Sequence, residues 1–565
     1  MEQEDARALA LDSREIGALP IINHFFDRLQ LYQLISQVVP DHKNQKLSHT
    51  AAILLFVRNI LIERHPLYKL SEWAQRFDPN LVGLGKTEAS VLNDDRVGRS
   101  LDALFDADRA SLLTTIVLRA VEHFAVQVSQ LHNDSTTVTV YGEYSAERSR
   151  RKGKSSMALR IGHNKDHRPD LKQLLFTLTV SRDGAVPIHY KSYDGNTTDD
   201  RTHIHTWEAL RRITGRSDFI YVADSKLCTR TQMGHIVQES GRFICVLPES
   251  RKECAWFKEW FRTHGIQWEE LLRRPDHRRP KSAEHIYWGY ESPMASQEGY
   301  RIIWILSSQK QEQDARNRQR RIERTISALD GLKQKVGTRK WKTKDQIQEA
   351  VQAILQKHHS ESWFEWRLVV NREETYKQKS KGRPGKNTEY IKLSKDKWSF
   401  EAMPNTTHIH YDAQTDGMFP LVTNIVSKDL SMREVLQKYK FQPYIEKRHQ
   451  QFKSVFEAAP VFLKLPHRIE ALMFVYFLVL LLNALIEREV RLAMCRDNIK
   501  YLLLYPEKRK CRYPATARII GLYSNLRKHE LSQRGQILKV FYDPLSKLHK
   551  TLLGLLKISP SPYCR

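Results

Sequence analysis

The stretch Tyr439-Lys-Phe-Gln-Pro-Tyr-Ile-Glu-Lys-Arg-His-Gln-Gln-Phe-Lys453 decides how the rest of the chain is interpreted. Upstream of it, Ser431 is followed three residues later by Glu434, which is a capping-box pattern. This pattern predicts a helix that begins near Ser431 and runs into the stretch.

On a continuous helix, a rotation of about 100° per residue places four side chains within roughly 60° of one another: Tyr439, Gln442, Glu446 and Lys453. One carboxylate then shares a helix face with groups suited to binding phosphates. Pro443 lies inside this helix, where it removes a backbone hydrogen bond and kinks the axis. We therefore expect Tyr439 to be displaced from the common face.

The spacing Tyr-x2-Gln-x3-Glu-x6-Lys resembles the Tyr-Arg-Glu-Lys signature of a large superfamily of bacterial insertion-sequence transposases, with Gln442 in the position of the Arg. A neutral amide lacks the bidentate charge of Arg, which Arg448 or Lys447 could compensate. One branch of the superfamily carries Gln here, and the following Pro-Val-Phe-Leu at 460–463 resembles that branch.

The resemblance implies two further acids upstream, and both have a match. Asp134 lies in Leu131-His-Asn-Asp-Ser-Thr-Thr-Val-Thr-Val140, similar to the first strand of the family, and Asp224 ends Phe219-Ile-Tyr-Val-Ala-Asp224. With Glu446 they give the order Asp, Asp, Glu of a ribonuclease-H-like catalytic core. Taken singly, each Asp is explained as well by a helix cap or an ion pair.

The implied chemistry is metal-dependent cleavage of DNA. Two divalent ions about 3.5–4 Å apart can activate a nucleophile and stabilise a leaving oxygen, and Mg²⁺ prefers carboxylate ligands. By the resemblance, Asp134 bridges two Mg²⁺ ions, for which Mn²⁺ could substitute, and Asp224 and Glu446 each complete one. Water then attacks first, and the freed 3′-hydroxyl attacks target DNA second.

Composition favours a polyanionic partner. The 565 residues include 91 Lys and Arg against 65 Asp and Glu, a net charge of +26 and a pI near 9.7, which favours nucleic acid. A membrane surface is the competing reading, but the longest apolar run, Ala471 to Leu482, is shorter than the ~20 residues that span a bilayer. It predicts a buried core helix.

The location we expect is the bacterial cytoplasm, in association with the nucleoid. The N-terminus, Met-Glu-Gln-Glu-Asp, lacks the pattern of a signal peptide. Six cysteines show no Cys-x2-Cys pair and no zinc spacing, and we interpret them as reduced thiols.

Changes in periodicity predict an α/β protein in five parts. Residues 1–125 are predicted to be a helical N-terminal domain with no strand, and the resemblance implies that this domain binds DNA. By the same resemblance, the strands of 126–250 form the first part of a ribonuclease-H-like, retroviral-integrase-like core. The long segment 251–425 is predicted to be a mixed α/β insertion domain. Residues 426–490 complete the core, and 491–565 form a basic, helical C-terminal region.

Within the core, strand and helix patterns follow one another in the order β-β-β-α-β-α-β, which is the order that the resemblance implies. The predicted strands cover residues 125–141, 171–180, 185–193, 219–223 and 242–247, with helices over 202–212 and 229–239. Asp134 then lies within the first strand and Asp224 at the end of the fourth.

Further DNA contacts are predicted from cations in loops and on the signature helix. Arg151 and Lys152 belong to the basic run Arg148 to Lys154, and Arg383 to the loop Lys377 to Lys386, whose Gly-Arg-Pro could enter a minor groove. A solvated charged loop explains both runs equally well. The signature stretch adds Tyr439, Gln442, Arg448 and Lys453.

We interpret the chain as a DDE transposase of a mobile element. It is predicted to bind terminal inverted repeats and to catalyse two-metal-ion strand cleavage and strand transfer, in a cut-and-paste reaction, with transposon ends and target DNA as partners and a homodimer in the synaptic complex. Two alternatives stay open: an inactivated or repurposed transposase that only binds DNA, and a stand-alone ribonuclease-H-like DNA nuclease.

Overall fold

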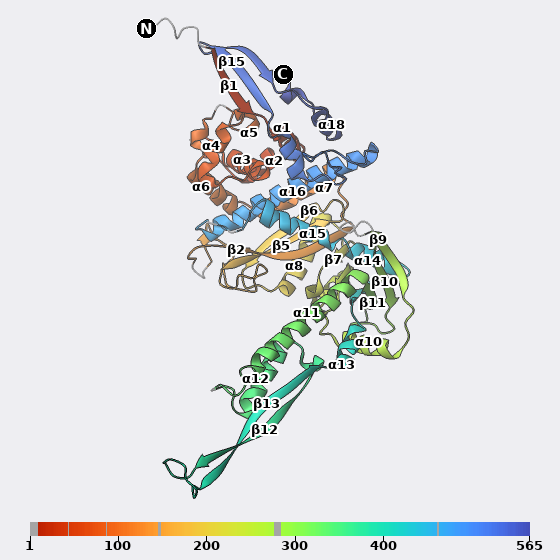
Figure 1. The fold of residues 1–565 in the computed structure, drawn as a ribbon. Coiled ribbons are helices and arrows are strands. Elements are labelled where there is room, and N and C mark those ends of the chain that lie inside the picture. Colours follow the sequence, from red (N-terminus) through yellow and green to blue (C-terminus); the bar gives the residue numbers. More distant parts are fainter. Residues whose placement is uncertain are drawn as a thin grey trace. The chain divides into compact units, whose positions relative to one another are not determined.

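The structure, a computed structural model, describes residues 9–42, 45–85, 87–144, 148–275, 284–338, 340–459, 461 and 463–564. The chain divides into two compact units (Figure 1). Unit 1 comprises Met1–Cys245, Thr423–Ile425 and Gln437–Arg565, and unit 2 comprises Val246–Val422 and Val426–Leu436. Pro460 and Phe462 of the quoted Pro-Val-Phe-Leu motif lie outside the described residues.

Unit 1 is built on five neighbouring strands in the order β6-β5-β2-β7-β8. They are β2 (Gln130–Thr139), β5 (Gln173–Ser181), β6 (Pro187–Asp194), β7 (Ile220–Val222) and β8 (Arg242–Val246). The first three in the chain pair antiparallel, whereas β7 pairs parallel to β2 and β8 parallel to β7. The five predicted strands are confirmed.

Two helices connect the parallel strands, α8 (His203–Thr214) and α9 (Arg230–Gln238), as the periodicity predicted. The glycine Gly215 ends α8 in the left-handed conformation, and Thr229 caps α9 through a hydrogen bond from the backbone N–H of Gln232. A short ribbon, β3 (Arg150–Arg151) and β4 (Lys154–Ser155), lies between β2 and β5 in the chain and was not predicted.

The core helix of unit 1 is α16 (Pro466–Arg496), which packs against α3 (His49–Ile62), α6 (Asp94–Asp106) and β6. By length and composition alone α16 could cross a membrane. However, 94% of its most apolar 18-residue window is buried within the protein, as in the core helix that its apolar run predicted.

The remaining helices of unit 1 come from both ends of the chain. The N-terminal ones are α1 (Leu19–Leu29), α2 (Leu31–Val38), α4 (Leu70–Gln75), α5 (Pro79–Val82) and α7 (Arg109–Phe124), and the C-terminal ones are α17 (Thr516–Tyr523) and α18 (Lys547–Leu555). The prediction that both ends are purely helical is wrong. β1 (Leu9–Glu15) pairs antiparallel with β15 (Arg527–Gln533), which forms a hairpin with β16 (Gln536–Tyr542).

Unit 2 contains four neighbouring strands in the order β14-β11-β10-β9. They are β9 (Glu269–Pro275), β10 (Glu284–Glu291), β11 (Arg301–Ser307) and β14 (Met418–Thr423). Four helices accompany them, α10 (Lys252–Thr263), α11 (Ser308–Lys333), α12 (Lys344–Lys357) and α13 (Thr406–Ala413). Helices and strands thus both occur in this segment, as its mixed α/β prediction expected.

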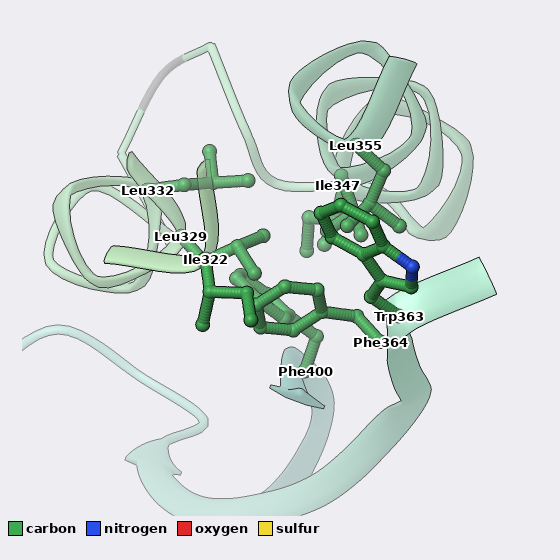
Figure 2. Packing of buried hydrophobic residues seen from close by; sticks show 9 residues of the cluster. Ile322, Leu329, Leu332, Ile347, Leu355, Trp363, Phe364 and Phe400 are labelled. Carbon is green, nitrogen blue, oxygen red and sulfur yellow. The ribbon is translucent and has the colours of Figure 1, made fainter. Parts of the chain in front are cut away.

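A long two-stranded hairpin, β12 (Phe364–Gln378) and β13 (Tyr390–Pro404), completes unit 2. Its base packs against α11 and α12 in one apolar cluster (Figure 2). Phe364 and Phe400 contribute from the strands, Ile322 and Leu329 from α11, and Ile347 from α12. The cluster fixes the start of the hairpin because these side chains are at most 9% exposed.

Two loops, one at Gly162 and one at Gly195, meet backbone to backbone in unit 1. A Cβ added to Gly195 would lie 2.0 Å from the carbonyl oxygen of Gln173, and one added to Gly162 would lie 2.2 Å from that of Gly195. Real Cβ atoms do not approach backbone this closely, so both positions require glycine.

We predict that Gly195→Ala lowers the free energy of unfolding by at least about 2–3 kcal/mol, because backbone atoms cannot move aside for the new methyl group. Gly234→Ala is the matched control: it lies in α9 with nothing within 4 Å of the added Cβ. The control should be neutral or stabilising by about 0.5–1 kcal/mol. Urea denaturation of both variants checks this, and equal stabilities would contradict the close packing.

Candidate active site

Asp134 and Asp224 follow the same register position on two neighbouring parallel strands. His132 of β2 pairs with Val222 of β7. Asp134 lies two residues further along β2, and Asp224 lies two residues past Val222, the last residue of β7. Side chains alternate along a strand, so a residue two positions on returns to the same face, and neighbouring strands are about 4.8 Å apart. The sheet therefore brings the two carboxylates together at the end of β7.

Both carboxyl groups carry a shifted pKa. The pKa of Asp134 is raised to about 7, chiefly by burial; the ammonium of Lys165 opposes the rise, and the charges of Asp224 and Asp199 add to it. Burial also raises the pKa of Asp224, again with Asp199 as a second cause. Three carboxyl groups, those of Asp134, Asp224 and Asp199, thus lie where Lys165 opposes the rise of both pKa values only in part.

Each of the two acids also makes a local backbone contact. Asp134 accepts the N–H of Ser135 at 2.8 Å, and Asp224 accepts the N–H of Lys226 at 3.0 Å as the cap of a short 3-10 turn. These contacts use one oxygen of each carboxylate, and 22% of the Asp134 side chain stays exposed. Local capping and a functional role are therefore compatible here.

The helix that carries Glu446 is interrupted, as Pro443 predicted. The capping box of Ser431 and Glu434 is present, but α14 (Met432–Tyr439) ends at Tyr439, and α15 (Gln442–Gln450) begins anew with Pro443 in its first turn. The single continuous helix face of the sequence prediction is therefore wrong. Glu446 lies exposed on α15.

Tyr439 is partly buried, and the charges of the three acids act on its hydroxyl. The pKa of Tyr439 is raised to about 12, chiefly by burial, with smaller contributions from the negative charges of Asp224, Glu446 and Asp134.

Gln442 is a structural residue between α15 and β2. Its Oε1 is 2.9 Å from Nδ1 of His132, and its Nε2 donates to the carbonyl oxygen of Asn133 at 3.1 Å. Only 7% of its surface is exposed. The predicted phosphate contact does not fit this position, since both ends of the amide are already hydrogen-bonded inside the protein.

Arg448 is buried as well, with 3% of its side chain exposed. Its guanidinium lies 2.9 Å from the carboxylate of Glu487 on α16 and donates to the carbonyl oxygens of Gly184 and Ala185. Burial alone would raise the pKa of Glu487, but the charges of Arg448 and Arg491 hold it below its ordinary value. Arg448 therefore anchors α15 to α16, and the predicted DNA contact does not fit its burial.

We predict that Arg448→Met lowers the free energy of unfolding by about 3 kcal/mol, because breaking a buried ion pair leaves a charge without its partner. The double variant Arg448→Met, Glu487→Leu should recover part of this loss. Since the Glu487 pKa is lowered in the folded state, the stability that the pair contributes is present at neutral pH and is lost as the pH falls below about 4.5. Chemical denaturation at pH 7 and pH 4 checks all three expectations; a pH-independent cost would contradict them.

Lys453 lies in a π-helical turn, Gln451–Val455, that follows α15 directly. Its ammonium contacts both carboxylate oxygens of Asp166, at 2.6 and 2.8 Å, and 19% of the side chain is exposed. Glu457, four residues further along the chain, pairs with Arg64. The phosphate contact of Lys453 stays a prediction.

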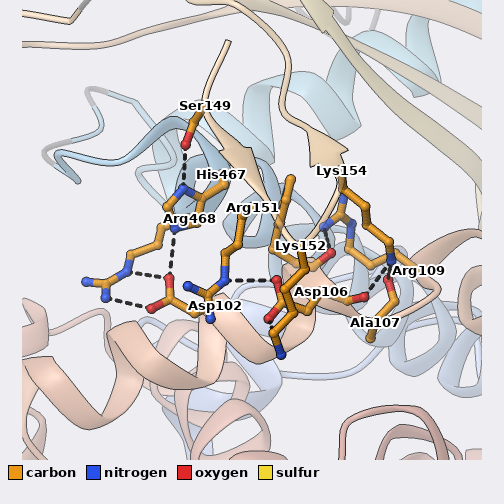
Figure 3. Close-up of polar contacts among 11 residues, drawn as sticks. Asp102, Asp106, Ala107, Arg109, Ser149, Arg151, Lys152, Lys154, His467 and Arg468 are labelled. Carbon is orange, nitrogen blue, oxygen red and sulfur yellow. Dashed lines mark hydrogen bonds and ion pairs between the residues drawn. The ribbon is translucent and has the colours of Figure 1, made fainter.

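Arg151 and Lys152 of the basic run bind one carboxylate of α6 (Figure 3). Nε of Arg151 lies 2.8 Å and Nζ of Lys152 lies 3.1 Å from the oxygens of Asp106. The Lys152 side chain remains 72% exposed, so it keeps surface for a phosphate. Arg383 lies exposed in the loop between β12 and β13 of unit 2.

Two residues beside Asp134 escaped the sequence analysis. Nε2 of His449 is 3.7 Å from Oδ2 of Asp134, and both ring nitrogens are buried without a hydrogen bond. Nζ of Lys165 bonds Ser135 and lies 3.0 Å from Asp199. His449 lies one turn after Glu446, so helical spacing could have identified it, whereas no local signal marked Lys165.

The donor atoms at this site are carboxylate oxygens, which suit Mg²⁺ or Mn²⁺. Within the described ranges, however, no group of three or more His, Cys, Asp and Glu side chains is close enough to hold a metal ion. Asp134, Asp224 and Glu446 therefore do not form a ready metal-binding cluster in this part of the chain.

Comparison with known proteins gives partial matches. Residues 11–118 match a family model described as a domain of unknown function (DUF4277). No curated protein matches the chain. The family match covers much of the N-terminal helices and none of the three acids.

Three solved transposase structures are similar to parts of the chain. A piggyBac transposase synaptic complex with hairpin DNA has a TM-score of 0.27 and 12% identity, over 51% of this chain and 60% of that chain. A Mos1 transposase paired-end complex with the left transposon end has 0.13 and 10%, over 35% and 58%. A Mos1 mariner paired-end complex with Mn has 0.14 and 11%, over 43% and 79%.

This chain therefore spans 60% of the length of the piggyBac transposase chain. At these TM-scores the similarity assigns no activity, and a function has to rest on the site itself.

Proposed function

We propose that this chain is a DDE-type DNA transposase that binds the terminal inverted repeats of a mobile element and catalyses strand cleavage and strand transfer. The observation that carries the proposal is the position of Asp134 and Asp224 at one register step of two parallel strands. The negative charge of Glu446 contributes, with those of Asp134 and Asp224, to the raised pKa of Tyr439, which supports a place for Glu446 at the same site.

The strand topology supports a ribonuclease-H-like core. Three antiparallel strands are followed in the chain by two that are parallel to the first, in the order β6-β5-β2-β7-β8. Unit 2 is then an insertion between β8 and the helix that carries Glu446, which corresponds in chain order to the predicted insertion domain.

Asp134, Asp224 and Glu446 would hold the two Mg²⁺ ions. The raised pKa of Asp134 and Asp224 fits this role, because a divalent cation would offset negative charge that the protein leaves partly uncompensated. When bound, such ions activate water and stabilise the leaving 3′-oxygen.

The chain's own residues position the DNA strand. Tyr439 stays a neutral hydrogen-bond donor at physiological pH, since its pKa is about 12, and its hydroxyl suits a phosphate oxygen. Lys165 holds the backbone beside Asp134 through Ser135. Because no side chain is needed as a nucleophile, the buried His449 acts only by fixing the surroundings of Asp134.

The proposed partners are double-stranded DNA at the transposon ends and at the target, with a homodimer in the synaptic complex. The net charge of +26 supports a nucleic-acid partner. The proposed location is the bacterial cytoplasm, with the nucleoid.

We predict that Asp134→Asn, Asp224→Asn and Glu446→Gln each lower the rate of DNA cleavage by about 10³-fold or more, because several kcal/mol of metal-mediated stabilisation is lost. Binding to the ends should change little. The substrates are the DNA segments that flank the reading frame, incubated with Mg²⁺.

Glu457→Gln is the matched control, because Glu457 lies four residues after the signature stretch that ends at Lys453. Its side chain is 62% exposed and pairs with Arg64. It should cleave like the wild type. If Glu457→Gln loses cleavage and Glu446→Gln keeps it, the third catalytic carboxylate is Glu457 and the assignment of Glu446 is wrong.

A strand-transfer assay with pre-cleaved ends separates the alternatives. A wild-type protein that binds ends but neither cuts nor joins them is a repurposed DNA-binding protein. One that cuts without joining is a stand-alone nuclease.

A further inference from the structure

The outer part of the β12–β13 hairpin belongs to no core. All side chains of residues 371–377 and 390–397 are exposed, whereas buried side chains occur only at the base, beside the apolar cluster of Figure 2. Figure 1 shows this ribbon extending beyond α12 within unit 2. Folding therefore does not explain the residues of this outer segment, which we call the arm.

The arm is strongly basic. Between Tyr376 and Lys392 it carries six Lys and Arg residues and one acid, Glu389, which is a net charge of +5. Like charges this close repel one another and destabilise a free ribbon. Such a concentration of cations is expected where a polyanion binds.

Cross-strand ion pairs use only part of this charge. Lys379 pairs with Glu389 and Lys392 with Glu374, both at 2.7 Å. Over 340–459, which is described without a gap, no ion pair involves four other cations of the arm: Lys377, Lys381, Arg383 and Lys386. Three of the four lie on the turn that joins the strands, so they present positive charge at its tip.

The arm also exposes apolar surface. Tyr376 and Tyr390 are 65% and 53% exposed, and Ile391 and Leu393 nearly half. In the register of the hairpin, Tyr376 lies opposite Lys392 and Tyr390 opposite Gln378. Residues that pair directly point to the same face of an antiparallel ribbon, so this face combines two tyrosines with a lysine.

We propose that the arm is a second DNA-binding element, which binds duplex DNA through its phosphates with the four unpaired cations. The proposal rests on DNA being the substrate of the proposed function. A two-stranded ribbon fits the width of a DNA major groove. Eight residues of β12 outside the base extend about 25 Å, the length of roughly seven base pairs.

DNA explains the arm better than an acidic peptide or an anionic membrane. Regularly spaced phosphates match cations distributed along both strands and the turn, whereas an acidic peptide would need a groove and the arm has two open faces. Membrane-binding elements bury a continuous apolar face. Each face of the arm instead carries a mixture of charged, polar and apolar side chains.

The test is the salt dependence of duplex binding by the full-length protein. The triple variant Lys381→Gln, Arg383→Gln, Lys386→Gln removes three charges from an exposed turn without touching a core. A fluorescent duplex of arbitrary sequence, about 40 base pairs long, is titrated over a salt series. The slope of log affinity against log salt should fall in magnitude by about 2–3, because each lost phosphate contact contributes about 0.9.

The matched control removes three other exposed lysines of unit 2, in Lys335→Gln, Lys342→Gln, Lys344→Gln. Its slope should stay within about 0.5 of the wild-type value, since only contacts release counterions. Equal slopes for wild type and arm variant would overturn the proposal, and so would equal losses in the two triple variants. Loss of binding to phosphatidylserine vesicles or to an acidic peptide, with duplex binding unchanged, would assign another partner and also overturn it.

The same titration with Asp134→Asn separates the arm from the catalytic site. The arm contribution to the slope should persist in a protein that cannot cleave. If the wild type cleaves no DNA but the arm variant still loses slope, the proposed function fails and the arm stands. If cleavage occurs and the slopes coincide, the arm fails alone.

Discussion

The parallel pairing of β2 with β7 is the constraint on which the site depends. Hydrogen bonds place His132 opposite Val222, and every residue further along each strand inherits that register. A slip by one residue would turn one carboxylate to the other face of the sheet. The site is therefore held by backbone pairing deep in unit 1, and its two acids need no contact with each other to stay together.

Buried residues hold α15, the helix that carries Glu446, against this sheet. Gln442 bonds to β2, Arg448 pairs with Glu487 of α16, and Phe452 stacks on Phe176 of β5 at 4.7 Å. Together they fix both ends of α15, so that Glu446 projects from a helix that cannot rotate freely. A second rigid element thus supports the candidate site, which favours reproducible placement of the Glu446 side chain.

Local patterns in the sequence predicted much of this arrangement. The strand of Asp134 is rich in β-branched residues from Thr136 to Val140, and the short strand before Asp224 is apolar. Pro443 predicted the break between α14 and α15, because proline lacks the N–H that a continuing helix needs. Gln442 and Arg448 could not be interpreted correctly, since a polar residue in a signature motif looks the same whether it faces DNA or a buried partner. Their partners, His132 and Glu487, lie 310 and 39 residues away.

The pairing of β1 with β15 was missed for the same physical reason, since the strands are short and their partners are about 516 residues apart. This pairing also governs when unit 1 can form. Translation adds about 5–20 residues per second, so β1 waits roughly 25–100 s on the ribosome for its partner strand. Unit 2 is complete before that, and α15 follows it. A nascent chain can therefore finish its insertion first, whereas the sheet of β1, β15 and β16 forms only near the end of synthesis, so partial translation products lack the complete unit 1.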